Sequence, residues 1–556
     1  MRFILKYCIY IFLFFSTINC AKKASPTGGP KDTIPPVLIS ASPKLNTTFF
    51  DKDEVKFIFN EFVTLNEINK QLIISPPLKI GGYKVSPTTG ASKKITLSIL
   101  DSLLENTTYT FNFGESIQDY NEGNKMPYFL YTISTGAKID SLNLKGTIKD
   151  AIKMDPEKYI SLQLYPLDSS YSDSTIYFQK PFYVTSTLDT TIFKFNNLKA
   201  GKYELIALKD FSNNYFFDQN TDQVGFLNSP ISLPGDSIVE LKLFKEKANF
   251  SWAEPFFIND HHIGHGYYGD YNGQSFKLIS DVPESFGYII NKNRKNDTLN
   301  YWFKGIKTDS LKFEYPDNDS IKTKVVKFKK PIKDSLIIIQ ITIGAIDLTD
   351  IFKVSSNLPI VSSDSSLVKI RKIDSTMIPA NIKIDENYDR VEINFKLLPN
   401  DMYDIQLLPK ALQDFWGNTH DTLNFRVSTK KVEDYGNIFI QLIYEDSEPF
   451  ILELLKSSRV IRSYKEPQKN SNYSFKLLNP GKYILRLIKD KNNNDKWDTG
   501  NYLKKIQPEE VIYYPFEIEL RANWDLNETF NVNQKYLDLL KTQTSSDSLE
   551  VNDGQD

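Results

Sequence analysis

Residues 485–502 place oxygen-bearing side chains at short, regular intervals directly after an apolar run. Counted from the first aspartate, four side chains and one main-chain carbonyl fall at positions one, three, five, seven and nine, which is the ligand spacing of calcium loops. A loop with two carboxylates belongs in the weak, ~10⁻⁴–10⁻³ M range of extracellular calcium modules. The candidate structural calcium ligands are Asp490, Asn492, Asn494, Lys496 through its carbonyl, and Asp498.

Three departures separate this segment from an EF-hand. Position six is Asp495 instead of glycine, position twelve is Asn501 instead of glutamate, and the preceding pattern is that of a strand. The alternative interpretation is a turn whose Asp and Asn side chains bind main-chain N–H groups without a metal. Both interpretations also apply to an upstream copy of the spacing, which consists of Asp210, Ser212, Asn214 and Asp218.

Aromatic residues interrupt the upstream copy and gather again in a Tyr- and Gly-rich segment. Aromatic side chains in loops are typical of contact surfaces, because they bring a large apolar area together with a polar tip. We therefore expect binding surfaces at two loops, 211–217 and 262–273. The candidate binding residues are Phe211, Tyr215, Phe216, Tyr267 and Tyr268.

The only histidine cluster, His261, His262 and His265, lies at the start of the second of these loops. Two histidines four residues apart can share a metal ion on a helix. Glycine at 264 and 266 disfavours a helix here, and no glutamate occupies the position that it has in zinc proteases. A polar contact loop is the favoured interpretation, and a metal site is the alternative.

Catalytic motifs are missing from the sequence. It contains no Gly-x-Ser-x-Gly elbow and no phosphate-binding glycine loop, and its two cysteines, Cys8 and Cys20, both lie near the N-terminus. We therefore predict a protein that is not an enzyme and has no cofactor beyond the candidate calcium. The net charge of −2, without a long basic block, argues against nucleic acid as a partner.

The N-terminus has the features of an export signal. Arg2 and Lys6 precede an apolar run that is too short to span a bilayer, and an abrupt polar change follows Cys20. The segment resembles a bacterial lipoprotein signal, which implies a signal peptide at 1–19, acylation of Cys20 and a flexible tether over 20–34. Ala21 then implies the outer membrane by the same resemblance, on either its surface or its periplasmic side. The alternative is an ordinary secretory signal.

Strand patterns dominate the remaining ~520 residues. Runs such as 54–60, 108–113 and 390–396 alternate apolar and polar residues with period two, and clusters of Asn, Asp, Gly and Pro separate them. Single cores rarely grow beyond ~250 residues, so several domains are expected. The pattern predicts an all-β chain of tandem β-sandwiches.

Two internal repeats organise these strands. In the first, Tyr109 and Tyr403 are separated by 294 residues, and so are the pairs Asn124/Asn418 and Thr135/Thr429. The second repeat contains "L-x-x-G-x-Y" motifs at 198–203 and 478–483, which are separated by 280 residues. Two module types therefore occur twice, in the same order.

The first module, with its Pro35-Pro36 opening, the "LLENTTYTF" stretch and the closing Gly123-Asn124, resembles the bacterial Ig-like domain of S-layer and other envelope proteins. The second module, with its "L-x-x-G-x-Y" motif, resembles the transthyretin-like, collagen-adhesin B-type sandwich. The resulting domains are Ig-like 35–136, transthyretin-like 140–248, an unassigned β domain 249–347, a divergent Ig-like 348–430, transthyretin-like 434–535 and an acidic tail 536–556.

These resemblances imply a lipid-anchored outer-membrane arm, in which five domains in a row hold contact loops away from the bilayer. Its expected partners are the membrane, through the lipid anchor, and envelope or outer-membrane proteins. The alternative is a glycan-binding lipoprotein with an aromatic platform that uses Trp252, Tyr267, Tyr268 or Trp302. A hydrolase in the unassigned 249–347 region is a third interpretation.

Overall fold

A computed structural model describes most of the chain, and its described residues are 31–235, 238–259, 261–317, 320–329, 335–465 and 470–533. The predicted signal peptide (1–19), Cys20, most of the tether and the tail (536–556) lie outside these residues. Nearly all regular structure is strand, which confirms the all-β prediction. Within the described ranges, none of the helices has the length and apolar character needed to cross a bilayer.

The first sandwich shows how period-two patterning builds the core. In strand β2 (Glu54–Leu65), Val55, Phe57 and Phe59 are buried, whereas Ile58 between them faces out. One sheet has the order β1-β2-β5-β4, with β7 paired to β2, and the other has the order β3-β6-β8. The elements are β1 (Leu38–Ser42), β2, α2 (Ile68–Gln71), β3 (Ile73–Ser75), β4 (Tyr83–Ser86), β5 (Ser92–Ile99), β6 (Thr108–Asn112), β7 (Ile117–Asp119) and β8 (Leu130–Ser134).

The second sandwich pairs its first and last strands, β9 and β16, in parallel. Its sheets have the orders β12-β9-β16 and β11-β10-β13-β14, with β15 also paired to β13. The elements are β9 (Leu142–Asp150), β10 (Ser161–Pro166), α3 (Thr175–Phe178), β11 (Tyr183–Ser186), β12 (Ile192–Leu198), β13 (Gly201–Lys209), β14 (Gln223–Phe226), β15 (Ile231–Leu233) and β16 (Ile238–Leu243).

The third sandwich is the region without an assigned family. Its sheets have the orders β17-β18-β21-β20 and β19-β22-β23. The elements are β17 (Ser251–Asn259), β18 (His262–Tyr268), β19 (Lys277–Leu278), β20 (Gly287–Lys292), β21 (Thr298–Lys304), β22 (Ser310–Asp317) and β23 (Ser320–Lys327).

The fourth sandwich begins before residue 348, because β24 and β25 pair with its strands β26 and β34. Its sheets have the orders β24-β26-β31-β30, β25-β34-β32-β28-β29 and β27-β33. The elements are β24 (Ile338–Gln340), β25 (Ala345–Ile346), β26 (Phe352–Ser356), β27 (Ile360–Ser363), η1 (Ser365–Leu367), β28 (Val368–Lys372), β29 (Met377–Ile378), β30 (Asn381–Ile384), β31 (Arg390–Asn394), β32 (Met402–Leu407), β33 (Leu412–Asp414) and β34 (Leu423–Thr429).

The fifth sandwich reproduces the topology of the second strand for strand, with orders β38-β35-β42 and β37-β36-β39-β40 and with β41 paired to β39. Its first and last strands, β35 and β42, are also parallel. The elements, after η2 (Val432–Asp434), are β35 (Gly436–Ile443), β36 (Phe450–Lys456), β37 (Arg459–Tyr464), β38 (Asn472–Leu478), β39 (Gly481–Lys489), β40 (Val511–Tyr513), β41 (Ile518–Leu520) and β42 (Asp525–Asn531).

The repeated Ig-type residues perform the same task in the first and fourth sandwiches. The Tyr109 hydroxyl accepts a hydrogen bond from the Leu104 amide at 2.9 Å, and the Tyr403 hydroxyl accepts one from the Leu398 amide at 2.6 Å. The side chains of both tyrosines are buried. These residues repeat because each one fixes the chain just before a central strand.

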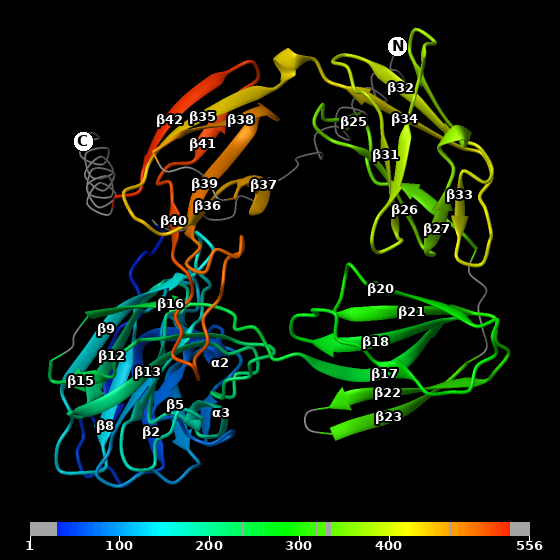
Figure 1. Cartoon of the computed structure of the whole chain (residues 1–556). Coiled ribbons are helices and arrows are strands. Elements are labelled where there is room, and N and C mark those ends of the chain that lie inside the picture. The colour runs from blue at the N-terminus through cyan, green and yellow to red at the C-terminus, as the bar shows by residue number, and fades with distance from the viewer. Residues whose placement is uncertain are drawn as a thin grey trace, which may run out of the picture.

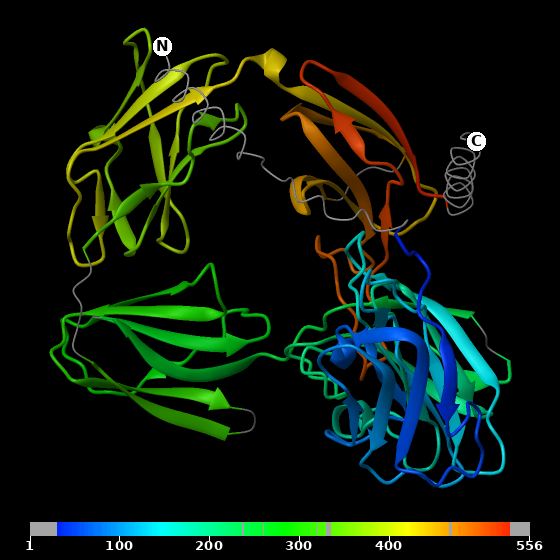
Figure 2. The same ribbon diagram turned by 180° about the vertical axis from the view of Figure 1, so that it is seen from behind.

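The five sandwiches follow one another around a closed ring (Figure 1). The first and second pack together, the third and fourth follow, and the fifth returns to the second, where its loops reach past β40 toward β16 (Figures 1 and 2). The expectation of five domains in an elongated row is therefore wrong. Loop contacts that a local sequence pattern does not reveal close the ring.

Candidate functional site

The predicted calcium segment is the loop that joins β39 to β40. Asp490 directly follows Lys489, the last residue of β39, and only 2% of its surface is exposed. Its Oδ1 accepts a hydrogen bond from the Asn494 amide at 3.0 Å, and its Oδ2 accepts one from the Asp495 amide at 2.8 Å. This carboxylate therefore fixes the turn, which is the task that the metal-free interpretation gives it.

The side chain of Asp498 is also bonded inside the loop. Its Oδ2 accepts hydrogen bonds from the side-chain amides of Asn492 at 2.5 Å and Asn494 at 2.7 Å, and the Lys247 ammonium lies 3.6 Å from its Oδ1. These contacts bring Asn492, Asn494 and Asp498 together, with the amide nitrogens of both asparagines toward the carboxylate. A calcium ion bound here would replace the amide contacts of Asp498, and its binding stays a prediction.

A buried acid that sequence analysis missed holds the other side of this loop. The carboxylate of Glu509 accepts hydrogen bonds from the amides of Lys491 at 2.8 Å and Asp498 at 2.9 Å. Burial raises the pKa of this carboxyl. The spacing pattern did not reveal Glu509, because an irregular stretch of chain separates it from the Asp/Asn series.

The upstream loop, between β13 and β14, is built in the same way. Asp210 accepts hydrogen bonds from the amides of Ser212 at 3.0 Å and Tyr215 at 2.7 Å, and burial raises the pKa of its carboxyl. Asp222 accepts one from the Asp218 amide at 3.0 Å, and it precedes β14 as Glu509 precedes the equivalent strand β40. The predicted ligand Asn214 accepts one from the Phe216 amide at 2.8 Å.

The second half of the C-terminal loop enters the second sandwich. The side chain of Tyr502 is completely buried there. Its hydroxyl oxygen lies 2.7 Å from that of Tyr171, and its ring centroid lies 5.3 Å from the ring of Phe226 in an edge-on arrangement. Burial raises the pKa of the Tyr502 hydroxyl. Tyr502 therefore belongs to the core of a domain that precedes it by more than two hundred residues.

Polar contacts surround this tyrosine. Thr499 donates a hydrogen bond from Oγ1 to the Lys245 carbonyl at 2.6 Å, and Gln507 donates one from Nε2 to the Phe226 carbonyl at 2.9 Å. The main-chain amide of Tyr502 donates to the buried carboxylate of Glu246. Because these groups are paired, the cost of removing them from water is offset.

A single lysine completes the contact. The ammonium of Lys505 lies 2.9 Å from the carboxylate of Glu204 and 3.0 Å from that of Asp173. It also lies 3.9 Å from the ring centroid of Tyr502. We call residues 499–507 the clasp. Its chemistry is that of an interface, in which one buried aromatic anchor is surrounded by hydrogen bonds and ion pairs.

The histidines do not converge. His262 and His265 lie three residues apart on β18 and therefore face opposite sides of the sheet. His262 stacks on Trp302 with ring centroids 3.5 Å apart, and its Nε2 lies 3.1 Å from Asn300 Oδ1. His265 is completely buried, with ring centroids 4.5 Å from Trp252 and 4.3 Å from Phe276, and burial lowers its pKa to about 4.

The segment predicted as the second contact loop is largely a strand, and this prediction was wrong. In β18, residues 263, 265 and 267 face the core. Gly264 lies on the other face of the sheet, where the ring of Phe256 and the side chain of Ile258, both on β17, occupy the space that a side chain at Gly264 would need. Tyr267 is only 3% exposed, whereas Tyr268 is 53% exposed. Trp252 and Trp302 are also buried, so the sugar-binding platform that includes Tyr267 is not formed.

The first predicted contact loop, 211–217, is partly exposed to solvent. Phe211 is 62% exposed at the surface of the second sandwich, while Tyr215 and Phe216 are half-buried. The Lys209 ammonium lies 6.0 Å from the ring of Phe211. An aromatic ring beside a cation remains a candidate partner contact.

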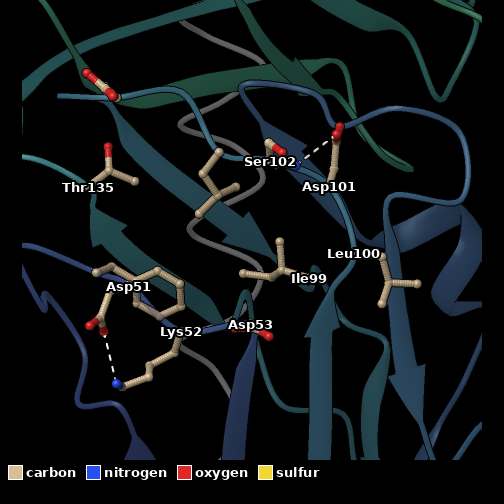
Figure 3. A pocket seen from close by; sticks show the side chains of 11 residues that line it. Asp51, Lys52, Asp53, Ile99, Leu100, Asp101, Ser102 and Thr135 are labelled. Atoms are coloured by element: carbon tan, nitrogen blue, oxygen red, sulfur yellow. Dashed lines mark hydrogen bonds and ion pairs between the residues drawn. The ribbon is translucent and has the colours of Figure 1, made fainter.

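One open cavity of 480 Å³ lies at the end of the first sandwich (Figure 3). Two of the carboxylates that line it, those of Asp101 and Asp51, are bonded to neighbouring groups. Asp101 accepts hydrogen bonds from the amides of Lys79 at 2.8 Å and Ser102 at 2.9 Å, and these bonds hold the pKa of its carboxyl below the usual value. Asp51 is paired with Lys52 at 3.2 Å. A carboxyl that stays ionised is unsuited to donate a proton near neutral pH.

Across the described ranges, no three His, Cys, Asp or Glu side chains come together as a group that could hold a metal ion. The clasp joins two domains through a buried tyrosine and paired polar groups. Sequence reasoning found the turn that precedes the clasp, but not Tyr502, Lys505 or Glu246.

Comparison with known proteins supports the domain type. Residues 32–135 match the family model "Bacterial Ig-like domain". No curated protein matches the chain. Solved structures that match include domains 1–6 of surface layer protein SbsC (10% identity, 88% of this chain and 68% of that chain, TM-score 0.16) and BcpA, the major pilin subunit of Bacillus cereus (9%, 70% and 98%, 0.12). A three-domain segment of titin also matches (10%, 44% and 94%, 0.14).

The match to the family model covers the first sandwich almost from end to end. The shared hydrogen bonds of Tyr109 and Tyr403 relate the fourth sandwich to the first. The chain is thus a series of tandem β-sandwiches, of which the first, at residues 32–135, matches the family model of bacterial Ig-like domains.

Proposed function

We propose that the protein is a non-enzymatic lipoprotein, anchored in the outer membrane through Cys20, that acts as a structural scaffold for other envelope proteins. The observation that carries the proposal is the closed ring. Its clasp buries an aromatic anchor together with paired polar groups, and so holds sandwiches that lie far apart in the sequence in one arrangement. A fixed frame suits a protein whose task is to position partners.

The other junctions of the ring support the same role. Between the third and fourth sandwiches, Trp416 donates a hydrogen bond from Nε1 to the Phe303 carbonyl at 3.2 Å, and the guanidinium of Arg294 lies 2.9 Å from Asp389. Between the fourth and fifth, Asn479 donates to Asp347 at 2.7 Å. Domains that are weakly joined usually move relative to one another. These direct contacts limit such motion.

Labelling with a fatty-acid analogue tests whether Cys20 is acylated and anchors the protein. The full precursor is produced in a bacterium with an outer membrane that is fed an alkyne-bearing fatty acid, and membranes are separated from soluble fractions. The wild type is expected to carry the label and to sediment with outer membranes, whereas the Cys20→Ser variant carries none and is released. Label on both proteins, or on neither, contradicts the proposal.

Chemical crosslinking in intact cells, followed by mass spectrometry, tests the scaffold role. We expect crosslinks from exposed loop residues near Phe211 to one or a few envelope proteins. The Phe211→Ser variant should lose those crosslinks while it keeps the links within the ring. If crosslinks join only residues of this chain, the scaffold role is wrong.

A further inference from the structure

The first sandwich carries an exposed apolar patch on the outer face of its β1-β2-β5-β4 sheet. The patch consists of Val37, Ile39, Ile58 and Phe62, with exposed fractions of 55, 65, 43 and 54%. Ile58 and Phe62 lie on the outward side of β2. A bulge in β1 opposite Ile58 lets neighbouring residues there face outward together, which brings Ile39 beside Ile58.

Basic side chains border this patch. Lys94 on β5 is opposite Ile58, and the ammonium of Lys93 lies 5.5 Å from the ring of Phe62. Lys56 on β2 is paired with Glu54 at 3.2 Å, and Glu61 lies between the outward residues of the same strand. The border thus has three lysines against two glutamates. Long lysine side chains can cover apolar surface with their stems and place their charge at the water boundary.

No other sandwich covers the patch within the part of the chain that the structure describes. The second sandwich packs on the opposite side of this domain, where the Val184 amide donates to Ser75 Oγ on β3 at 3.0 Å. Figure 2 shows the dark-blue strands of the first sandwich at the front, with no other domain over them. Exposed apolar area of this kind on a folded domain marks a surface that meets something other than water.

We propose that the patch rests on the lipid bilayer, an inference that builds on the proposed acylation of Cys20. The patch lies near the N-terminal end of the described chain, where Val37 donates a hydrogen bond to Asn60 Oδ1 of β2 at 2.7 Å. The seventeen residues 20–36 between Cys20 and Val37 can span at most about 60 Å. The acyl chains therefore keep the patch close to the membrane and raise its effective concentration there.

The composition of the patch suits a bilayer. Aliphatic and phenylalanine side chains enter the boundary between headgroups and acyl chains, while flanking lysines contact anionic headgroups. The acyl chains supply the anchor. The patch adds a second contact, which orients the ring with β1 and β2 toward the membrane.

The test uses the mature chain from residue 20 with Cys20→Ser, so that no acyl chain contributes. The only cysteines in the sequence are Cys8 and Cys20, so an added cysteine is unique. One protein carries an environment-sensitive dye at Ile58→Cys, and the control carries it at Val361→Cys, a residue of similar exposure (40%) in the fourth sandwich that is followed by two serines. Each is mixed with vesicles of phosphatidylethanolamine and phosphatidylglycerol, or of phosphatidylcholine alone.

The emission of the dye at residue 58 should shift to shorter wavelength, more strongly with the anionic vesicles, while that of the dye at 361 should not shift. The unlabelled Ile58→Ser/Phe62→Ser variant should float with vesicles about tenfold less than the wild type, because two partly exposed apolar side chains no longer enter the lipid. Its thermal unfolding should match that of the wild type, since both residues face outward.

Three results would overturn the proposal: no shift at residue 58, an equal shift at both labels, or unchanged flotation of the double variant. Analytical sedimentation tests whether the patch binds a second copy of the chain instead. A wild-type dimer that is lost in the double variant would show this. All these proteins lack the acylated thiol, so a negative result leaves the acylation proposal standing. Loss of acylation in the earlier experiment would likewise leave a positive vesicle result intact.

Discussion

The hydroxyl oxygens of Tyr171 and Tyr502 lie 2.7 Å apart, although 331 residues separate them in the chain. Tyr502 contributes to the second sandwich as if it belonged to that domain, while its main chain belongs to the fifth. This pair is the buried centre of the contacts that join the fifth sandwich to the second and so close the ring.

Replacement of this anchor should open the ring. The Tyr502→Ala variant removes a completely buried side chain, which costs about 3–5 kcal/mol at such sites. We expect the radius of gyration, measured by small-angle X-ray scattering, to increase, while circular dichroism remains that of folded β-sandwiches. Phe211→Ala, at an exposed ring, is the control and should leave the scattering unchanged. Identical scattering from Tyr502→Ala and the wild type would mean that the clasp does not hold the ring closed.

Protonation of His265 should weaken the third sandwich in acid. Its pKa is about 4 in the folded chain and about 6.5 when unfolded, so between these values the unfolded state binds the extra proton. Its stabilising contribution is complete above pH 6.5 and is lost as pH falls toward 4, to a total of about 3 kcal/mol. Tryptophan fluorescence, followed during urea unfolding from pH 7 to 4, measures the change.

The matched variant for this experiment is His265→Phe, which keeps a ring among Trp252, Phe276 and Tyr315 but cannot be protonated. Its free energy of unfolding should depend less on pH than that of the wild type. If both proteins lose the same stability between pH 7 and 4, the carboxyl groups elsewhere account for the effect.

The sequence predicted those features whose contacts are local along the chain. The repeat of Tyr109 and Tyr403 marks one local hydrogen bond, and alternation in β2 marks one buried face. It failed at β18, where glycines normally typical of loops make room for side chains of the adjacent strand. It could not find the clasp, because the partners of Tyr502 are set by domain placement and not by spacing.

The repeated tyrosine hydrogen bond should stabilise the fourth sandwich measurably. Tyr403→Phe removes the hydroxyl that accepts from the Leu398 amide, and a loss of about 1 kcal/mol in the free energy of unfolding is expected. Tyr109→Phe should have a similar effect on the first sandwich. Tyr120→Phe, at an exposed ring, is the control for urea unfolding and should change nothing. Equal midpoints for all three variants and the wild type would refute a shared stabilising role.

Calcium binding at the C-terminal loop is open to a direct test. Millimolar calcium should raise the melting temperature of the wild type, because an ion bound only by the folded state stabilises it. Asp498→Ala should abolish that rise, since it removes the carboxylate next to Asn492 and Asn494. Magnesium serves as the control ion. A melting temperature that is indifferent to calcium in the wild type would leave the loop as a metal-free turn.

The parallel pairing of first and last strands in the second and fifth sandwiches has a mechanical consequence. Residues 238–243 of β16 run beside residues 145–150 of β9 in the same direction, so the chain enters at one end of this ladder and leaves at the other. Tension along the chain would therefore load those hydrogen bonds together in shear, instead of opening them one at a time. Modules connected in this way resist stretching, which would suit the membrane-anchored scaffold proposed above.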